Sequence, residues 1–520
     1  MFVRRAIPLA LLVLSSATFS AASELRSELA LPGVTSFFPG DPGYANASRP
    51  FNLRFTLEPV AVVYPETVHE LADIVKIGKA HHLRVSARSG GHSYIANGLG
   101  GENGTLVIDM AKFTNVTVNP STKTAVIETG NRLGDVALAL NEYGFAMPHG
   151  YGMSPDSVFI PLAHLPPLAR QNMPICALAW ADTHHTAGMA FTSRMWGLTL
   201  DNILAINLVL ANGTITKASK DVNPELFWAM RGAGPSFGIT TSIEFSVFTA
   251  PASVIVFQYN WQLDVASAAT ALDTFQKFVI EPDLPQEFGA EIVLTRGAIA
   301  GNVSFGLTGA WHGDPSLLNG TVAPFLAAMP PLNAVTLTPN DWIGSVEFLA
   351  GSTLNTSTAP DYTDTFYAKS LMTPQASPMN KAARTAFMNG LAHEGFTSNT
   401  SWFFQVELYG GSNSKINSVP TDETAFVHRS SLFTIQFYAS SFNNAPPYPD
   451  FGFTFLDDLV DGITSNSPKD WDYGAYTNYM EDKLVDYKKR YYGSHYPRLL
   501  ALKEKLDPTG VFDFPVGIDD

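Results

Sequence analysis

The 520-residue chain contains one cysteine, Cys176, and few charged residues. A single cysteine excludes an intrachain disulfide and every metal or redox motif that needs several cysteines. Charged residues make up 15% of the chain, where about 25% is usual, and 47 Asp and Glu outnumber 32 Lys and Arg. Because nucleic acids and anionic membranes are bound through clustered Lys and Arg, the net charge of −15 argues against both partners.

Hydrophobic residues are plentiful, at 46% of the chain, and aromatic residues make up 12%. This composition is typical of a densely packed globular protein and excludes a disordered one. A chain of this length is too long to fold around one ordinary hydrophobic core, so we expect two domains or one large composite domain.

The N-terminus has the pattern of a secretory signal. Within residues 1–22, Arg4 and Arg5 precede an apolar run at 6–14, and small residues follow at 20–22. The run is shorter than the roughly 18 residues that a membrane span needs, so cleavage is favoured over anchoring. Eight Asn-x-Ser/Thr sequons support a secreted, extracellular glycoprotein: Asn46, Asn103, Asn115, Asn212, Asn302, Asn319, Asn355 and Asn399.

The periodicity indicates an α+β fold. Short β-rich runs alternate with helices from about residue 51 to 144, and Thr67 with Glu70 predicts a capping box at the start of one helix. After about residue 250, longer strands alternate with helices such as 265–280. This second pattern predicts a sheet covered by helices on one face.

Three segments carry residues suited to chemistry. The glycine-rich stretch 88–94 can turn its backbone N–H groups toward an anion, although an ordinary turn would read the same. In strand 403–407, Phe403, Gln405 and Glu407 share one face at a period of two, and they face either a substrate or solvent. The aromatic-rich tail after residue 471 either contributes to a site or packs against the rest of the protein and closes the fold.

Two other kinds of site lack support. His149, His184 and His185 have no metal-ligand spacing with each other or with a carboxylate, so we expect no metal site. Gly-x-Ser-x-Gly, the nucleophile turn of many serine hydrolases, occurs once, as GPSFG at 234–238, and this short pattern alone does not predict a hydrolase.

Taken together, the motifs resemble the berberine-bridge-enzyme-like FAD-linked oxidases of the vanillyl-alcohol-oxidase superfamily, and most closely the fungal secreted oligosaccharide oxidases. The resemblance covers nearly all of the chain after residue 22. It is carried by collinear motifs: VSARSGGHSY at 85–94, GNRLGD at 130–135, WGLTLDN at 196–202, NPELFWAMRGAGPSFGI at 223–239, and the tail motifs at 476–479 and 491–493.

The resemblance implies a two-lobed fold with an FAD-binding domain at 23–248, a substrate domain of antiparallel sheet and helices at 249–462, and a C-terminal segment, 463–520, that completes the FAD domain. It implies that His92 bonds covalently to FAD. The other residues that it assigns to the cofactor are Arg88, Ser89, Gly90, Gly91, Ser93, Gly234, Gly238 and Asn478.

The same resemblance implies catalytic roles for Tyr479 and Glu407, where the oligosaccharide oxidases usually have Asp. It assigns the sugar pocket to Tyr94, Phe403, Gln405 and Gln436. Glu407 would accept the Tyr479 proton, so that the phenolate can take a proton from the substrate hydroxyl.

Residues 151–190 depart from the family pattern, because the cysteine and glycine motifs expected there are absent. Reading the codons from Cys176 to Ala187 in a shifted frame permits Cys-Pro-Gly-Val-Gly-Gly-His, the missing motif. We therefore favour translated intron followed by a frame shift over a divergent loop. As written, the chain supports no second, cysteinyl link to FAD.

The sequence thus predicts a secreted, monomeric FAD oxidase that transfers hydride from a substrate C–OH, most simply the anomeric carbon of an oligosaccharide, and reduces O₂ to H₂O₂. Two alternatives stay open. One is a secondary-metabolite oxidase or oxidative cyclase on the same scaffold, and the other is an inactive secreted relative.

Overall fold

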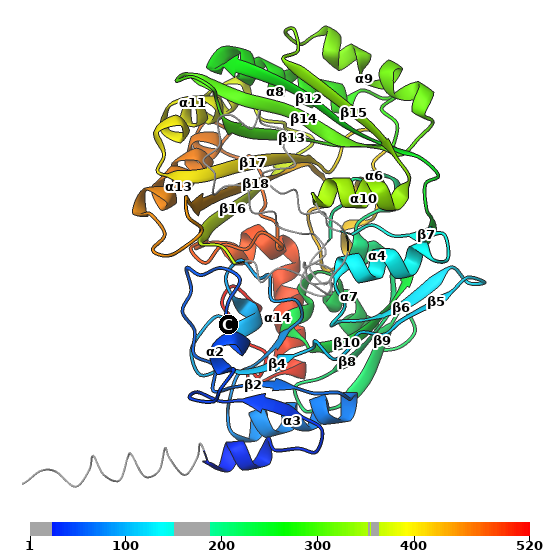
Figure 1. Ribbon diagram of the computed structural model, residues 1–520, viewed down its shortest axis with the longest axis vertical. Coiled ribbons are helices and arrows are strands. Elements are labelled where there is room, and N and C mark those ends of the chain that lie inside the picture. Colours follow the sequence, from blue (N-terminus) through cyan, green and yellow to red (C-terminus); the bar gives the residue numbers. More distant parts are fainter. Residues whose placement is uncertain (1–22, 150–187, 352–353, 355–362, 520) are drawn as a thin grey trace, which may run out of the picture.

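The computed structural model describes residues 23–149, 188–351, 354 and 363–519, which form two stacked lobes (Figure 1). The predicted signal peptide and nearly all of the anomalous segment lie outside these ranges.

The lower lobe in Figure 1 begins with a four-stranded sheet in the order β1-β2-β4-β3. Strands β2, β4 and β3 run parallel, and β1 is antiparallel to β2. Helix α3 (Val68–Ala80) begins at the predicted capping box, where the Thr67 hydroxyl accepts the Glu70 N–H and the Glu70 carboxylate accepts the Thr67 N–H. The strands are β1 (Thr35–Phe37), β2 (Ala61–Tyr64), β3 (Val85–Arg88) and β4 (Leu106–Asp109).

A five-stranded antiparallel sheet, in the order β5-β6-β10-β8-β9, forms the rest of this lobe. Its strands are β5 (Val116–Asn119), β6 (Thr124–Glu128), β8 (Ile203–Val209), β9 (Ile215–Ser219) and β10 (Ile239–Ser246). Helices α4 (Leu133–Asn141) and α7 (Pro224–Ala233) pack with it, and β7 (Phe145–Ala146) pairs with β11 (Phe248–Thr249).

The upper lobe is a seven-stranded antiparallel sheet in the order β15-β12-β14-β13-β17-β18-β16. Its strands are β12 (Val254–Asp264), β13 (Phe288–Arg296), β14 (Asn302–Trp311), β15 (Ala334–Asn340), β16 (Phe366–Pro374), β17 (Thr400–Leu408) and β18 (Ser431–Ser441). The lobe's helices are α8 (Val265–Ile280), α9 (Leu318–Ala327), α10 (Trp342–Ala350), α11 (Lys381–Thr397) and α13 (Asp450–Ser465).

Alternation along the central strands separates a core face from a site face. Phe404 and Val406 of β17 pack into the hydrophobic core that α8, α11 and α13 cover. Because side chains of a strand point alternately to its two faces, Gln405 and Glu407 lie on the opposite face. Figure 1 shows this face of the sheet turned toward the lower lobe. This arrangement confirms the predicted α+β fold. Helix α10 departs from the expected placement of helices on one face, because Trp342 and Val346 pack on the opposite face of the sheet, in the core shared with the lower lobe.

The C-terminal segment returns to the lower lobe. Helix α14 (Tyr496–Leu506), red in Figure 1, packs against α7, and Lys503 donates to the Ser236 carbonyl at 3.0 Å. The final residues therefore belong spatially with the first lobe. The domain boundaries at 248 and 462 stay predictions.

Two buried arginines fasten the lobes together. Arg194, in the short helix α6 (Ser193–Trp196), donates to the carbonyls of Gly410, Pro285, Phe288 and Ser412 in the upper lobe. Arg429 of the upper lobe forms a two-point ion pair with Asp201, at 2.7 and 2.9 Å. Among the described residues, no helix has the length and apolar character that crossing a membrane requires.

Candidate active site

A cluster of buried polar side chains lies on the site face of the upper sheet. Gln405 of β17 pairs in register with Gln436 of β18, and Glu407 of β17 pairs with Glu291 of β13. The four side chains are at most 5% exposed. Gln405 donates from Nε2 to both carboxylate oxygens of Glu291 at 3.1 Å. Polar groups buried this deeply usually have hydrogen-bond partners. Which of these groups have a partner and which lack one therefore affects their chemistry.

Tyr479, from the C-terminal segment, reaches this cluster. Its hydroxyl donates to Glu407 Oε1 at 2.6 Å. The other oxygen, Glu407 Oε2, is buried and has no hydrogen-bond partner among the described residues. Burial, and then the nearby Glu291 carboxylate, raise the pKa of Glu407 well above its usual value. Burial and the Glu407 charge likewise raise the pKa of Tyr479.

Aromatic rings pack around this pair. Tyr94 stacks on Tyr479 with ring centroids 5.8 Å apart, and its hydroxyl accepts a hydrogen bond from Gln436 Nε2 at 2.6 Å. Phe403 stacks on Tyr438 at 5.0 Å. The structure thus brings together all six residues predicted for catalysis and substrate binding: Tyr94, Phe403, Gln405, Glu407, Gln436 and Tyr479.

The glycine-rich loop that carries His92 follows β3, at the carboxyl end of the parallel strands. His92 packs against Phe51, with ring centroids 4.6 Å apart, and Phe51 belongs to the same aromatic cluster as Tyr438. The Arg88 side chain supports the loop from its own side: it donates to the Ala47 and Arg49 carbonyls and underlies Gly91, whose φ is +75°. Arg88 is therefore engaged in shaping the loop.

Two backbone donors of this loop have the chemistry that binding of an anion such as a diphosphate requires. Within the described part of the chain, no acceptor faces the backbone N–H groups of Gly90 and Ser93. Loops at the carboxyl ends of parallel strands with such N–H groups bind anions well. The Ser89 hydroxyl, in contrast, donates to the Thr129 carbonyl.

The remaining predicted cofactor residues lie in two places. Asn478 donates from Nδ2 to the Tyr476 hydroxyl at 3.0 Å, next to Tyr479. Gly238 immediately precedes β10, and a Cβ there would come within 2.8 Å of the Leu208 side chain, so it serves close packing of β10 against β8. Gly234 precedes it in a short 3₁₀ turn.

Sequence reasoning missed Glu291, Tyr438 and Asp364. Glu291 is an isolated acid within the apolar strand 288–294, and that pattern alone could have marked it as a buried functional group. Asp364 accepts the Tyr438 hydroxyl at 2.7 Å, and burial raises the pKa of Asp364 to about 6. Across the described ranges, no group of three His, Cys, Asp or Glu side chains is placed to hold a metal ion.

Two family models match the chain: an FAD binding domain over residues 59–159, and the berberine and berberine-like domain over residues 475–519. A carbohydrate oxidase of Microdochium nivale is 31% identical over 98% of this chain and 98% of its own length. A chitooligosaccharide oxidase of Gibberella zeae is 33% identical over 92% of this chain and 91% of its own.

Solved structures of oligosaccharide oxidases are similar to this chain as well. A chitooligosaccharide oxidase structure superposes with a TM-score of 0.84 at 30% identity, covering 95% of this chain and 99% of that one. A glucooligosaccharide oxidase from Acremonium strictum with a 6-S-cysteinyl, 8α-N1-histidyl FAD superposes with a TM-score of 0.83 at 28% identity, covering 95% and 99%. The chain therefore belongs to the berberine-like family of the vanillyl-alcohol-oxidase superfamily and is an FAD-dependent oxidoreductase.

Proposed function

We propose that the protein oxidises the anomeric C–OH of an oligosaccharide to the lactone and that O₂ takes up the two electrons and two protons to give H₂O₂. The observation that carries this proposal is the 2.6 Å hydrogen bond from Tyr479 to the buried Glu407, within a cluster of aromatic and amide side chains. FAD, when bound, supplies the acceptor for the hydride that leaves the carbon.

In this proposal Tyr479 and Glu407 move one proton. The Tyr479 oxygen takes the proton of the substrate hydroxyl while its own proton passes to Glu407 Oε1. A carboxylate with one hydrogen bond and an unpartnered second oxygen is poorly stabilised, and it is more basic for that reason. The proton therefore ends on Glu407, and the negative charge that developed on the substrate oxygen is discharged as the C=O bond forms.

The other pocket residues bind and orient the sugar. Phe403, which stacks on Tyr438 through one face, offers its other face to a pyranose ring, whereas Gln405 and Gln436 offer amide groups to its hydroxyls. The relatives named for carbohydrate, chitooligosaccharide and glucooligosaccharide oxidation support this substrate class.

We further propose that His92 anchors FAD covalently. Its position beside Phe51, at the border of the aromatic cluster, supports this role. Wild-type protein should stay yellow after acid precipitation, and His92→Ala should release its flavin. Flavin that remains attached in the variant would assign the anchor to another residue. Colourless wild-type protein would favour the inactive alternative.

The substrate class is tested by H₂O₂ release with cello-, xylo- and chito-oligosaccharides against aromatic alcohols. Tyr479→Phe should slow flavin reduction by about 10²-fold or more, because no hydroxyl is left to relay the proton. Reduction at the wild-type rate would remove Tyr479 from the mechanism. Oxidation of aromatic alcohols alone would favour the secondary-metabolite alternative.

We also propose that the protein acts outside the cell. Six sequon asparagines are exposed and open to glycosylation: Asn46, Asn103, Asn115, Asn212, Asn319 and Asn399. Digestion of the protein from culture medium with an N-glycanase should lower its apparent mass. Retention of the protein inside cells would contradict export.

A further inference from the structure

The segment that carries Tyr479 folds over the outer strand of the upper sheet. Gly474 and Met372 exchange backbone hydrogen bonds at 2.8 and 3.0 Å, and the Tyr476 N–H donates to the Ser370 hydroxyl at 2.8 Å. Met372 and Ser370 lie on β16, which is the last strand in the sheet order. Tyr479 therefore stands on a segment that is attached to the edge of the sheet.

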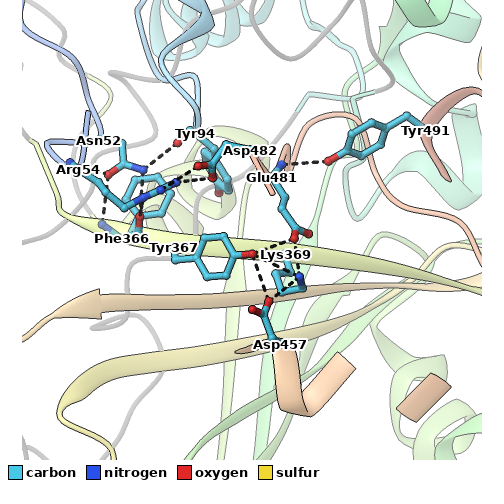
Figure 2. A network of polar contacts seen from close by, with 10 residues as sticks. All are labelled: Asn52, Arg54, Tyr94, Phe366, Tyr367, Lys369, Asp457, Glu481, Asp482 and Tyr491. Carbon is cyan, nitrogen blue, oxygen red and sulfur yellow. Dashed lines mark hydrogen bonds and ion pairs between the residues drawn. The ribbon is translucent and has the colours of Figure 1, made fainter. Parts of the chain in front are cut away.

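A buried lysine on this edge holds the segment just after Tyr479. Figure 2 shows Lys369 of β16 between the carboxylates of Glu481 and Asp457. The Lys369 ammonium donates to Asp457 at 2.8 Å and to Glu481, and the Tyr367 hydroxyl also donates to Glu481 at 2.8 Å. The Glu481 N–H donates to the Tyr491 hydroxyl at 2.9 Å. Glu481 is thus fixed through both its side chain and its backbone.

A second cation, Arg54, binds the residue after Glu481, and its contacts extend to Tyr94, whose ring stacks on Tyr479. Arg54 forms a two-point ion pair with Asp482, at 2.5 and 3.0 Å, and donates to the Phe366 carbonyl at 3.1 Å. The same carbonyl accepts Asn52 Nδ2, which also donates to the Tyr94 carbonyl at 2.8 Å (Figure 2). The backbones of Tyr94 and of the Tyr479 segment are therefore fastened to one strand.

Stability alone does not explain a charged pair at this depth. The Lys369 and Glu481 side chains are 11% and 4% exposed. Exchanging a buried ion pair for neutral groups of similar size is often neutral or stabilising, because desolvation offsets the attraction. Burial by itself would lower the pKa of Lys369, but Glu481 and Asp457 outweigh it and raise that pKa, so the cation persists. What the pair adds is a fixed geometry for the segment.

We propose that Lys369 is a positioning residue for Tyr479: through Glu481 it holds the tyrosine hydroxyl at the Glu407 carboxylate, with Arg54 and Asp482 as the second point of attachment. The proposal rests on the proposed function of Tyr479. Lys369 touches neither substrate nor cofactor, because its side chain lies with Tyr367 and Asp457 on the helix side of β16.

The test is a double-mutant cycle on full-length, flavin-loaded protein, with flavin reduction followed by stopped flow. Lys369→Met should slow reduction by about 10- to 100-fold, since small misplacements of reacting groups cost that much, with substrate Kd nearly unchanged. In the Tyr479→Phe background the same change should cost less than about threefold, because the group being positioned is gone. Lys369→Arg should retain most of the wild-type rate.

A second variant separates positioning from stability. Lys369→Met/Glu481→Gln removes both charges while keeping an acceptor for Tyr367, so it should fold even where Lys369→Met alone does not. It should still reduce flavin slowly. The matched control is Arg384→Met, which breaks a half-buried ion pair with Asp273 between α11 and α8. The control should lower the melting temperature and leave the reduction rate unchanged.

Two results would overturn the inference: equal losses with and without the Tyr479 hydroxyl, or a fully active Lys369→Met/Glu481→Gln protein. A Tyr479→Phe protein that reduces its flavin at the wild-type rate would instead contradict the proposed function. The two failures are therefore distinguishable in one set of measurements.

Discussion

Glu291 and Glu407 face each other across strands β13 and β17 as register partners, both buried within the site. Glu407 holds Tyr479, whereas Glu291 holds Gln405. Two carboxyl groups so placed oppose each other's ionisation, and the like-charge effect adds to that of burial. Burial first, and the Glu291 carboxylate on the next strand second, therefore raise the pKa of Glu407.

The first prediction concerns pH. A base must be ionised to accept a proton, and the pKa of Glu407 is raised, so flavin reduction should increase with pH above the range of an ordinary glutamate. Glu291→Gln removes the like charge but keeps an acceptor for Gln405, and it should move the rise to lower pH. Stopped-flow reduction between pH 4 and 9 measures both. A shift to higher pH in the variant would contradict the coupling.

The second prediction concerns the hydrogen bond between Tyr94 and Gln436. Tyr94→Phe removes the acceptor at 2.6 Å and leaves a buried amide N–H without it. The free energy of unfolding should fall by about 1–3 kcal/mol in urea denaturation. Tyr143→Phe is the matched control, because Tyr143 is 51% exposed and its change should be within about 0.5 kcal/mol. Equal effects of the two variants would count against the role of this bond.

The third prediction concerns Arg194. Arg194→Met removes a buried cation that serves four carbonyl oxygens, so the free energy of unfolding should fall by roughly 3 kcal/mol or more. Arg26→Met breaks an exposed pair with Asp41 and should cost less than about 1 kcal/mol. Chemical denaturation of both variants makes the comparison, and a mild effect of Arg194→Met would contradict the fastening of the lobes.

The fourth prediction concerns acid stability. Burial lowers the pKa of His428 to about 4. Between an unfolded value of about 6.5 and this folded value, the unfolded chain binds a proton that the folded chain does not, so stability falls as pH falls from about 6.5 to 4. His428→Gln should remove the contribution of this one proton to the fall of stability with falling pH. Melting temperatures across this range would show it, and an unchanged slope would refute the assignment.

Local patterns predicted local structure well. Thr67 and Glu70 form the expected capping box, helix 265–280 has the expected bounds, and the period-two pattern placed Gln405 and Glu407 on one face. These features depend on neighbours in sequence, and so a sequence contains their physical causes.

The site itself depends on long-range register, which no local pattern contains. Glu291 meets Glu407 only because β13 pairs with β17 in one particular register, and Lys369 meets Glu481 only because the tail crosses the edge of β16. Tyr479 and Glu407 were associated through family resemblance, and the structure supplied their distance. The predicted anomaly in residues 151–190 falls almost wholly outside the described residues.

The four carbonyl oxygens gathered by Arg194 come from the turn before β13, the start of that strand and the loop after β17, so separating the lobes would break all these bonds at once. Hinge opening is accordingly an expensive route for loading and release. Under the proposed function, entry of the substrate and release of the product would therefore not depend on the two lobes moving apart.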